Sequence, residues 1–329
     1  MPKSEPKTYQ RLPEFAGPDG VQVISYSEAD AYRQCPLKHL ITYKERWKKP
    51  VLPGSALSRG SLWHQVMEVH YGVIMAAYTG SGRVPKNRHG KVLADAWQAV
   101  RPYLFDSQSG AQDEDQVKVQ WMYEGYVEYW GVDDGWQILA MEYPFELALP
   151  DYDGNDSPYA MKGKIDIVAV DLETGGTWIW DHKSGANLPT QKSLEIDDQF
   201  GGYTWAMNKL GMPVVGSMHN AARTTMNKGD LPGAILNGTT KKQTLDQRFS
   251  RTFLNRTKQE QKNVALDFFA VAANAYPVDG ASRPVYSSPN PDSCKWKCDI
   301  KDVHLLARQG RDIHQALAEY GFAQDFTRH

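Results

Sequence analysis

The sequence predicts an α/β fold in which helices flank one mixed central sheet. Three observations support this prediction: an amphipathic helix precedes a run of three strands, a Gly-rich turn joins the last two strands, and a further helix and strand follow them. The expected elements are a helix over 58–80, a Trp- and Tyr-rich helix over 116–131, strands over 136–150, 159–172 and 177–183, a helix over 197–211, a strand over 213–222 and a long helical segment over 240–276.

Residues that start or stop helices give the expected boundaries. In the segment 25–47, Ser27 precedes an acidic residue and is the predicted cap, and Pro36 predicts a boundary or a kink. In the segment 58–80, Gly80 is the predicted stop. The apolar stripe of this helix is predicted to comprise Leu62, Val66, Val69, Val73 and Ala77.

The composition predicts a soluble, cytoplasmic protein. The chain has 329 residues, of which 41% are hydrophobic and 23% are charged, as is typical of globular proteins. No apolar run reaches the length that crosses a bilayer, and the first residues lack the apolar core of a secretory signal. We therefore expect a flexible tail over 1–20, a single domain over 21–329 and no membrane partner.

The basic residues are unevenly distributed along the chain. The net charge of −2 gives no global indication of a nucleic-acid partner, but residues 221–262 contain nine Lys or Arg and only three Asp or Glu. This local excess predicts a contact with a polyanion. A solvated helix face is the alternative interpretation.

Two acidic residues and a lysine are expected to meet on the predicted hairpin. If the turn is centred between Glu173 and Thr174, residues whose numbers add up to 347 face each other, and Asp166 then faces Asp181. Facing carboxylates repel each other, and Lys183 points to the same face of its strand as Asp181. Mg²⁺ or Mn²⁺, which prefer oxygen ligands, would relieve the repulsion. In the alternative interpretation the register differs and the two acids never meet.

Two further pairs of polar residues lie on the neighbouring helices. His64 and Glu68 are four residues apart on the helix before the strands, and Gln199 and Tyr203 are four apart on the helix after them. Taken alone, each pair fits a structural role equally well, because a helical histidine is commonly hydrogen-bonded within the fold and a Gln–Tyr pair commonly packs.

In this order, the motifs resemble the RecB-like branch of the PD-(D/E)XK nuclease superfamily. They are G-x-x-x-H, G-x-x-D, D-x-K and Q-x-x-x-Y, and the resemblance covers residues 25–205 with a further match near the C-terminus. In this sequence they run from Gly60 to His64, Gly163 to Asp166, Asp181 to Lys183 and Gln199 to Tyr203. The resemblance implies a restriction-endonuclease-like core with helical N- and C-terminal additions.

The resemblance also implies a role for each residue on the strands. His64, Asp166 and Asp181 would hold Mg²⁺ or Mn²⁺, and the backbone carbonyl of His182 would be a further ligand. Lys183 would orient and activate the attacking water and stabilise charge on the phosphate. The ring of His182, on the opposite face of its strand, is expected to pack.

The remaining candidates would act around this centre. The resemblance implies that Gln199 and Tyr203 position the DNA or the Lys183 side chain. Glu68 and Glu142 could support the metal ligands from outside. For Glu68, an ordinary surface role on the helix is the alternative.

The cysteines suggest a second metal centre, with Cys35, Cys294, Cys298 and His304 as candidate ligands. Their placement resembles the iron–sulfur members of this family, including phage-type and CRISPR-associated exonucleases, in which four cysteines hold a [4Fe–4S] cluster. This chain departs from that pattern, since His304 stands where the fourth cysteine is expected. A cluster with a histidine ligand, a structural Zn²⁺ and thiols without any metal are the three alternatives. Either metal would join residues 25–50 to residues 285–310.

The function implied by the resemblance is that of a metal-dependent DNA nuclease. We expect an exonuclease rather than an endonuclease, acting in recombination, repair or phage DNA processing in the cytoplasm of a bacterial or phage-infected host cell. Its partners would be DNA and a helicase, a recombinase or an annealing protein. One alternative is a catalytically silent nuclease-like subunit for DNA binding or assembly. Another is an interaction protein whose cysteine site is the working part.

Overall fold

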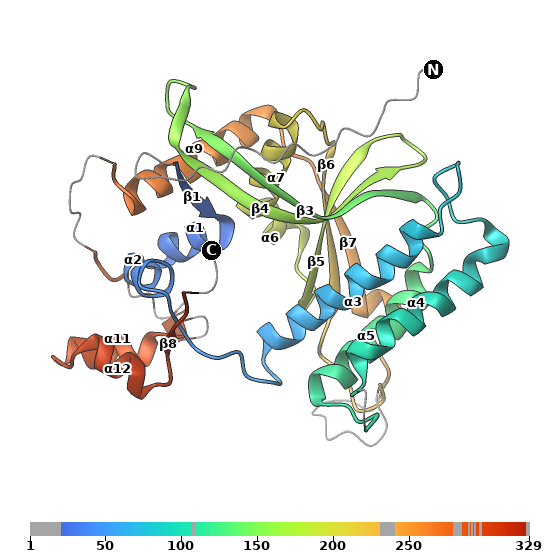
Figure 1. The fold of residues 1–329 in the computed structure, drawn as a ribbon, viewed down its shortest axis with the longest axis horizontal. Helices are drawn as coiled ribbons and strands as arrows, with labels where there is room; N and C mark the ends of the chain where they lie inside the picture. The colour runs from blue at the N-terminus through green and yellow to red at the C-terminus, as the bar shows by residue number, and fades with distance from the viewer. Residues whose placement is uncertain are drawn as a thin grey trace. The chain divides into compact units, whose positions relative to one another are not determined.

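The computed structural model describes residues 21–106, 109–230, 241–278, 285–288, 290, 292, 294–295 and 298–326, so the tail expected over 1–20 lies outside the described residues. The chain divides into two compact units: unit 1 comprises Met1–Pro50, Pro144–Gly163 and Lys262–His329, and unit 2 comprises Val51–Tyr143 and Lys164–Gln261. Two long strands, β3 (Trp136–Pro150) and β4 (Asp156–Asp171), contribute to both units (Figure 1). The residues predicted to act on DNA all belong to unit 2, and the cysteines belong to unit 1.

Unit 2 contains the predicted mixed sheet. The second half of β4 pairs antiparallel with β5 (Thr177–Gly185), β5 pairs parallel with β6 (Gly216–Arg223), and β6 pairs antiparallel with β7 (Phe249–Leu254). Parallel neighbours need a crossover connection, and the one between β5 and β6 carries α6 (Gln191–Glu195) and α7 (Asp198–Lys209). The predicted α/β class with a central mixed sheet flanked by helices is confirmed.

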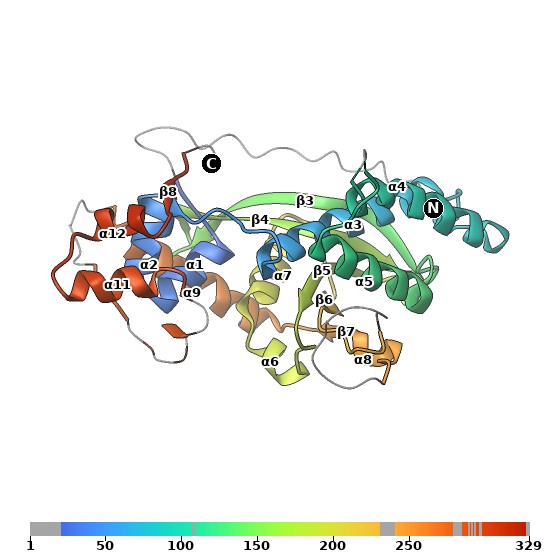
Figure 2. The same cartoon turned by 90° about the horizontal axis from the view of Figure 1, so that it is seen from below.

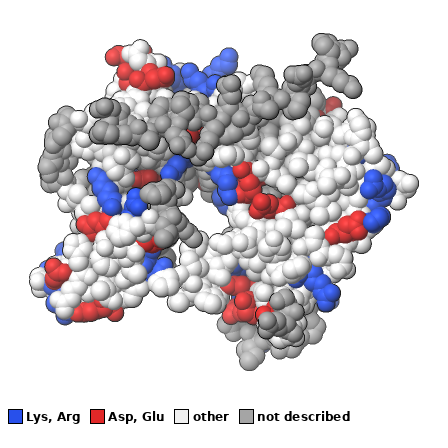
Figure 3. Space-filling model, viewed as in Figure 1, with Lys and Arg blue, Asp and Glu red and all other residues white. Residues whose placement is uncertain are grey.

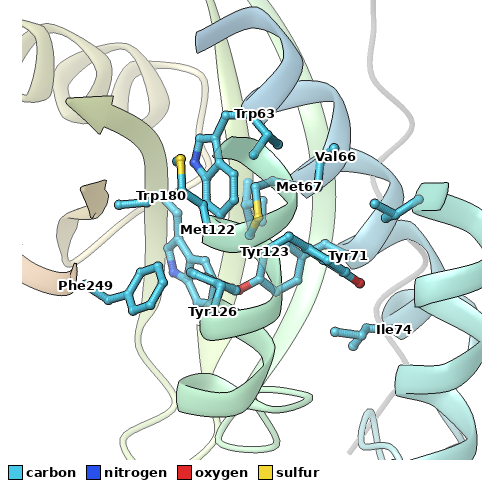
Figure 4. Packing of buried hydrophobic residues seen from close by; sticks show 14 of the residues in the cluster. Trp63, Val66, Met67, Tyr71, Ile74, Met122, Tyr123, Tyr126, Trp180 and Phe249 are labelled. Carbon is cyan, nitrogen blue, oxygen red and sulfur yellow. The ribbon is translucent and has the colours of Figure 1, made fainter. Parts of the chain in front are cut away.

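Helices α3 (Ala56–Ala76), α4 (His89–Leu104) and α5 (Glu114–Trp130) build the apolar core of unit 2 with the sheet. α3 and α5 lie against the strands, and α4 packs on these two helices (Figures 1 and 2). Figure 4 shows Trp63, Tyr126 and Trp180 within this core, where the rings of Trp63 and Tyr126 meet edge to face at 5.7 Å. Because full burial of one large side chain contributes roughly 1.5–3 kcal/mol, this packing fixes α3 firmly on the sheet.

The hairpin of β4 and β5 has the predicted register. Ile167 lies opposite Trp180, and in each following pair the two residue numbers also add up to 347. The backbone pairing stops at this pair, one residue before Asp166 and Asp181. The two aspartates therefore lie where the paired region of the hairpin ends.

The turn of this hairpin is fixed by an aspartate. Asp171 Oδ1 accepts the backbone N–H of Glu173 at 2.9 Å, and Asp171 Oδ2 accepts the hydroxyl of Thr174 at 2.7 Å. Gly175 has φ +73°, a backbone conformation that glycine adopts without strain. These local contacts set the turn length and, with it, the register of the strands.

The first helix begins and ends close to the predicted residues. α1 (Tyr26–Gln34) is capped by Ser25 rather than by Ser27, because the Ser25 hydroxyl accepts the N–H of Glu28. The boundary predicted at Pro36 is confirmed: Cys35 is extended, as the residue before a proline prefers, and α2 (Pro36–His39) starts at the proline.

The buried face of α3 differs from the predicted stripe. The buried residues of α3 are Trp63, Val66, Met67, His70, Tyr71 and Ile74. Of the predicted stripe only Val66 is fully buried, and Leu62, Val69, Val73 and Ala77 lie half-buried beside it. The prediction counted aliphatic residues, whereas the core prefers the larger aromatic side chains. The helix also ends at Ala76 and not at Gly80.

The prediction of one long helix over 240–276 was wrong in its first part. The described residues of this segment form α8 (Leu245–Arg248), β7 and α9 (Lys258–Ala275). β7 contains Arg251 in its middle, which made a buried strand hard to recognise. The structure accommodates it because Asp133 neutralises its guanidinium group inside unit 2.

Unit 1 has its own elements. β1 (Gln22–Ser25) pairs parallel with the first half of β4, β2 (Trp47–Lys48) pairs antiparallel with β8 (Ala323–Gln324), and a π-helical turn covers Leu40–Lys44. α11 (Lys301–Arg308) and α12 (Ile313–Glu319) enclose a small apolar cluster around Ile41. Among the described residues, the helices are all too short or too polar to cross a membrane.

Candidate active site

The centre of the candidate site is a pair of residues on one face of β5. Side chains alternate along a strand, so Asp181 and Lys183 share a face while Trp180 and His182 point into the apolar core. Asp181 is 7% exposed, and Lys183 Nζ donates to its Oδ1 at 2.9 Å. The other oxygen, Asp181 Oδ2, is buried without a hydrogen-bond partner among the described residues. An unpartnered buried carboxylate oxygen is costly, which marks it as a candidate ligand atom.

Asp166 on β4 is held by two contacts on a single oxygen. Its Oδ2 accepts the backbone N–H of His182 at 2.7 Å and lies 3.3 Å from Nδ1 of His64. His64 reaches it from α3, whose first turn is capped by Ser55. Three segments far apart in the sequence, α3, β4 and β5, thus converge as predicted.

Burial and neighbouring charges separate the pKa values of the two aspartates. Burial raises the pKa of Asp181 to about 6, while Lys183 opposes this rise and the charge of Asp166 adds to it. Burial also acts on Asp166, but the hydrogen bond and charge of His64 outweigh it and hold the pKa of Asp166 below its ordinary value. Burial lowers the pKa of Lys183, but Asp181 outweighs this effect and raises it, so the lysine stays protonated at neutral pH.

Helix α7 supplies the predicted glutamine and tyrosine. Asp197 caps the helix by accepting the N–H of Gln199, and Gln199 Nε2 lies 3.5 Å from Asp181 Oδ1. Tyr203, one turn later, is hydrogen-bonded to Gln199, and its burial raises its pKa. Gln199 therefore contacts the Asp181 side of the site, and Tyr203 contacts Gln199.

A pocket of about 590 Å³ opens beside α3, and its wall includes one face of that helix together with Asp166 and Lys183. Glu68 and Glu142, the two outer acidic candidates, both line it. Glu142 is ion-paired with Lys164, which follows Gly163 on β4. Its backbone has φ +49°, a strained conformation for a residue other than glycine, and such strain is commonly found at functional sites.

The donor atoms of this group fit a hard divalent cation, but they do not stand in a finished coordination shell. In the part of the chain that the structure describes, no three His, Cys, Asp or Glu side chains are placed to hold a metal ion. Protein partners occupy part of the candidate ligand atoms: Lys183 contacts one oxygen of Asp181, and His64 contacts one oxygen of Asp166. The unpartnered Asp181 Oδ2 is the feature that fits a cation.

The ring of His182 packs in the core, as expected. It is stacked on Tyr71 with 5.6 Å between ring centroids and an interplanar angle of 20°, and its Nδ1 lies 2.9 Å from the side-chain nitrogen of Asn220. Burial lowers the pKa of His182 to about 3, so the ring is neutral. Asn220 was not predicted, since nothing in the local pattern of β6 distinguishes it from a solvent-facing polar residue.

A second residue of β6 was also missed. His219 is the register partner of Asp181 on the parallel strand, is 5% exposed and packs edge to face on Phe200 of α7. Its pKa is lowered to about 4, chiefly by burial. Its position beside Asp181 follows from the strand register, which requires the β5–β6 pairing to be known.

The basic segment 221–262 is used differently from the prediction. Arg248 stacks on Trp121 and donates to its carbonyl, Arg251 pairs with Asp133, and Arg256 donates to backbone carbonyls. Arg223 also donates to the carbonyl of Ala186, so at least four of the nine basic residues make contacts within the fold. On the face that Figure 3 shows, the Lys and Arg side chains of the described residues form small groups, most with acidic side chains nearby. The contact of this segment with a polyanion stays a prediction.

The predicted cluster ligands of unit 1 do not form a metal site among the described residues. Cys35 Sγ accepts the backbone N–H of Ser288 at 3.4 Å, and Cys298 packs against the apolar cluster of α11 and α12. All three cysteines are free thiols, and burial lowers the pKa of His304. The described residues thus show no iron–sulfur or zinc site on Cys35, Cys294, Cys298 and His304.

The mixed sheet flanked by helices, with two aspartates and a lysine at the end of a hairpin, defines a restriction-endonuclease-like nuclease fold. The chain belongs to the PD-(D/E)XK nuclease superfamily, whose family model matches residues 23–303. Members of this superfamily use divalent metal ions such as Mg²⁺ or Mn²⁺. A comparison with curated proteins finds no match.

Two solved structures show distant similarity. The "Putative exonuclease" of Eubacterium rectale is 10% identical, with 88% of this chain and 99% of that chain covered and a TM-score of 0.40. The protein SSO0001 is 12% identical, with 65% of this chain and 79% of that chain covered and a TM-score of 0.30. Both similarities are too distant to assign an activity.

Proposed function

We propose that this chain is a metal-dependent DNA nuclease that hydrolyses phosphodiester bonds in the pocket beside α3. The observation that carries the proposal is the meeting of Asp166, Asp181 and Lys183 where the β4–β5 pairing ends, with one buried oxygen of Asp181 left without a partner. Membership of a nuclease superfamily supports the same activity.

The proposed metal ligands are His64, Asp166 and Asp181, with the backbone carbonyl of His182 as a further ligand. The hydrogen bond from His182 and the His64 contact both use Oδ2 of Asp166, and Oδ2 of Asp181 has no partner, so each aspartate has an oxygen to offer to a cation. Mg²⁺ and Mn²⁺ are the hard cations that such oxygens suit. When bound, such an ion lowers the pKa of a coordinated water and offsets the negative charge of the phosphate.

Lys183 is proposed to orient the attacking water and to stabilise the charge that develops on the phosphate. Its side chain is 40% exposed, lines the pocket and is kept protonated by Asp181. Gln199 and Tyr203 are proposed to hold the Asp181 carboxylate in place from α7. Glu142, paired with Lys164 at the pocket wall, is proposed to support the site from outside.

The finer parts of the proposal rest on the order of the four motifs. They favour an exonuclease of the RecB-like branch that acts in recombination, repair or phage DNA processing, beside a helicase, a recombinase or an annealing protein. The substrate is proposed to be DNA, which enters the pocket through its phosphate backbone.

The test compares linear DNA and circular DNA as substrates of the full-length chain. End-labelled linear duplex, linear single-stranded DNA and closed circular DNA are incubated with Mg²⁺, Mn²⁺ or a chelator. We expect loss of the linear substrates only when metal is present, no cutting of the circle, and no cleavage by Asp181→Asn. Lys91→Ala is the matched control, because Lys91 forms a similar Lys–Asp pair with Asp95 on the outer helix α4.

Each contrary outcome has a definite meaning. Cutting of circular DNA would show an endonuclease and overturn the exonuclease assignment. Intact DNA under all metal conditions, with DNA binding retained, would favour the catalytically silent binding subunit. Undiminished cleavage by Asp181→Asn would overturn the assignment of the site.

A further inference from the structure

A row of polar side chains crosses the core face of the sheet behind the candidate site. His182 on β5, Asn220 on β6 and Arg251 on β7 are register partners on adjacent strands and therefore point to the same face. His182 is 3% exposed and Asn220 is 1% exposed, and the apolar core of unit 2 surrounds them. Polar groups are rare in such a place unless each of them is hydrogen-bonded.

Asn220 connects the members of this row. Its side-chain nitrogen lies 2.6 Å from the hydroxyl of Tyr126 and 2.9 Å from Nδ1 of His182, and its oxygen accepts from Arg251 Nε at 3.4 Å. An amide nitrogen can only donate, so Nδ1 of His182 must be the acceptor. This bond and the stacking on Tyr71 hold the His182 ring in one orientation.

The far end of the row is anchored by a buried ion pair. Arg251 donates to Asp133 through two nitrogens, at 2.5 and 2.7 Å, and also donates to Tyr126 at 2.8 Å. Its guanidinium carbon lies 3.8 Å from the centroid of the Trp130 ring. A two-point contact of this kind fixes the direction of the guanidinium group as well as its position.

The near end of the row reaches the candidate metal ligands through the backbone. The N–H of His182 donates to Asp166 Oδ2 at 2.7 Å, the same oxygen that lies beside His64. The ring and this N–H belong to one residue, so the contacts that fix the His182 ring also restrain the position of the backbone that donates to Asp166. The row therefore extends without interruption from Asp133 to the carboxylate of Asp166.

Stability alone gives a weak reason for this row. A buried ion pair and its hydrogen bonds contribute no more than well-packed apolar residues of similar volume, and they are harmful unless every group is satisfied. What such a network can provide is one defined geometry. We infer that Asn220 and Arg251 are positioning residues, which orient the Asp166 carboxylate for a divalent metal ion through His182. This inference rests on the proposed function.

The experiment compares two variants of β6, each of which loses one buried hydrogen bond. Asn220→Leu removes the donor to His182, whereas Ser217→Ala removes the buried bond between Ser217 and Thr204, which has no connection to Asp166. Mn²⁺ affinity is measured by calorimetry and by the metal-induced rise in Tm, and the Mn²⁺ dependence of cleavage is measured in parallel. Tyr126→Phe is a milder second variant, because it removes one acceptor of Asn220 and keeps the ring.

We expect Asn220→Leu to weaken Mn²⁺ binding by about 10-fold or more, the usual effect of losing a partner that orients a metal ligand, with KM for DNA unchanged. Tyr126→Phe should give a smaller loss, and Ser217→Ala should lower Tm without changing Mn²⁺ affinity. If all three variants bind Mn²⁺ with the affinity of the wild type, the inference is overturned and the proposed function stays intact. If Asn220→Leu does not fold, Tyr126→Phe decides in the same way. If the wild-type chain binds no Mn²⁺ and cuts no DNA, the proposed function fails, and the inference fails with it.

Discussion

The ammonium group of Lys183 lies 2.9 Å from Oδ1 of Asp181, two residues earlier on the same face of β5. This contact occupies one carboxylate oxygen and leaves the other buried and unpartnered. The contact also holds the positively charged ammonium group of Lys183 at the wall of the pocket, where the phosphate of a substrate would bind. The pair thus places a candidate metal ligand and a candidate catalytic lysine two residues apart on one face of the strand.

Replacing Lys183 with alanine should lower kcat on the order of 10²–10³-fold, because a positioned donor to the developing negative charge is lost. Binding of DNA should change little, since Lys183 is proposed to act on the charge that develops during the reaction. Single-turnover cleavage in Mn²⁺ measures the first quantity, and fluorescence anisotropy of labelled DNA measures the second. Lys91→Ala should behave like the wild type. A Lys183→Ala chain that cleaves at the wild-type rate would remove the lysine from the mechanism.

Asp133→Asn should reduce the free energy of unfolding by about 3–5 kcal/mol, because Arg251 would remain buried without its counter-ion. Asparagine is the suitable replacement, since Asp133 has φ +53° and asparagine tolerates that backbone conformation. Urea denaturation followed by tryptophan fluorescence measures the change. Asp95→Asn, which breaks an exposed ion pair on α4, is the control and should cost less than about 1 kcal/mol. A similar cost for both variants would contradict the buried role of Arg251.

His70 should make the protein less stable in acid. Burial lowers its pKa from 6.5 to about 4, so below pH 6.5 the unfolded chain binds a proton that the folded chain does not. Stability is therefore fully present above pH 6.5 and is lost as the pH falls towards 4. His70→Gln should shrink the loss of unfolding free energy between pH 7 and pH 5 by about 2 kcal/mol. Urea midpoints at the two pH values test this, and an unchanged difference would show that His70 is protonated in the folded state.

Among the three alternatives for the cysteines of unit 1, the contacts of Cys35 and Cys298 favour thiols without a metal. The described residues bring no three candidate ligands together, and Cys298 packs as part of an apolar cluster. Protein purified without oxygen should therefore show no visible absorption from an iron–sulfur cluster and far less than one iron or zinc per chain. Stoichiometric metal that disappears in Cys298→Ser, but persists in Asp181→Asn, would restore the cluster prediction.

The sequence determined the candidate site better than it determined the surrounding fold. The hairpin register could be predicted because it depends on a short turn, and the contacts of Asp171 within that turn are local. The convergence of His64, Asp166 and Asp181 followed from motif order and strand geometry. Whether these groups share a metal ion is a property of their side-chain conformations, and the present contacts with Lys183 and His64 could not be read from spacing.

The errors arose where distant parts of the chain satisfy each other. β7 was missed because Arg251 interrupts its apolar pattern, and only the position of Asp133, far away in the sequence, makes that residue acceptable in the core. Asn220 escaped notice for the same reason, since its partners lie on α5, β5 and β7. For the cysteines, spacing alone did not predict the contact of Cys35 with Ser288 or the packing of Cys298 on the apolar cluster.

The five-residue link Leu172–Gly176 has a consequence for how this chain can change in evolution. Adding or deleting one residue there would shift β5 by one position against β4, and a shift of one position turns every side chain to the opposite face of the sheet. Asp181 and Lys183 would then be carried to the face that packs against α3 and α5, away from Asp166. Insertions in surface loops are ordinarily tolerated, but the length of the link between β4 and β5 should be as invariant as Asp166 and Asp181 themselves.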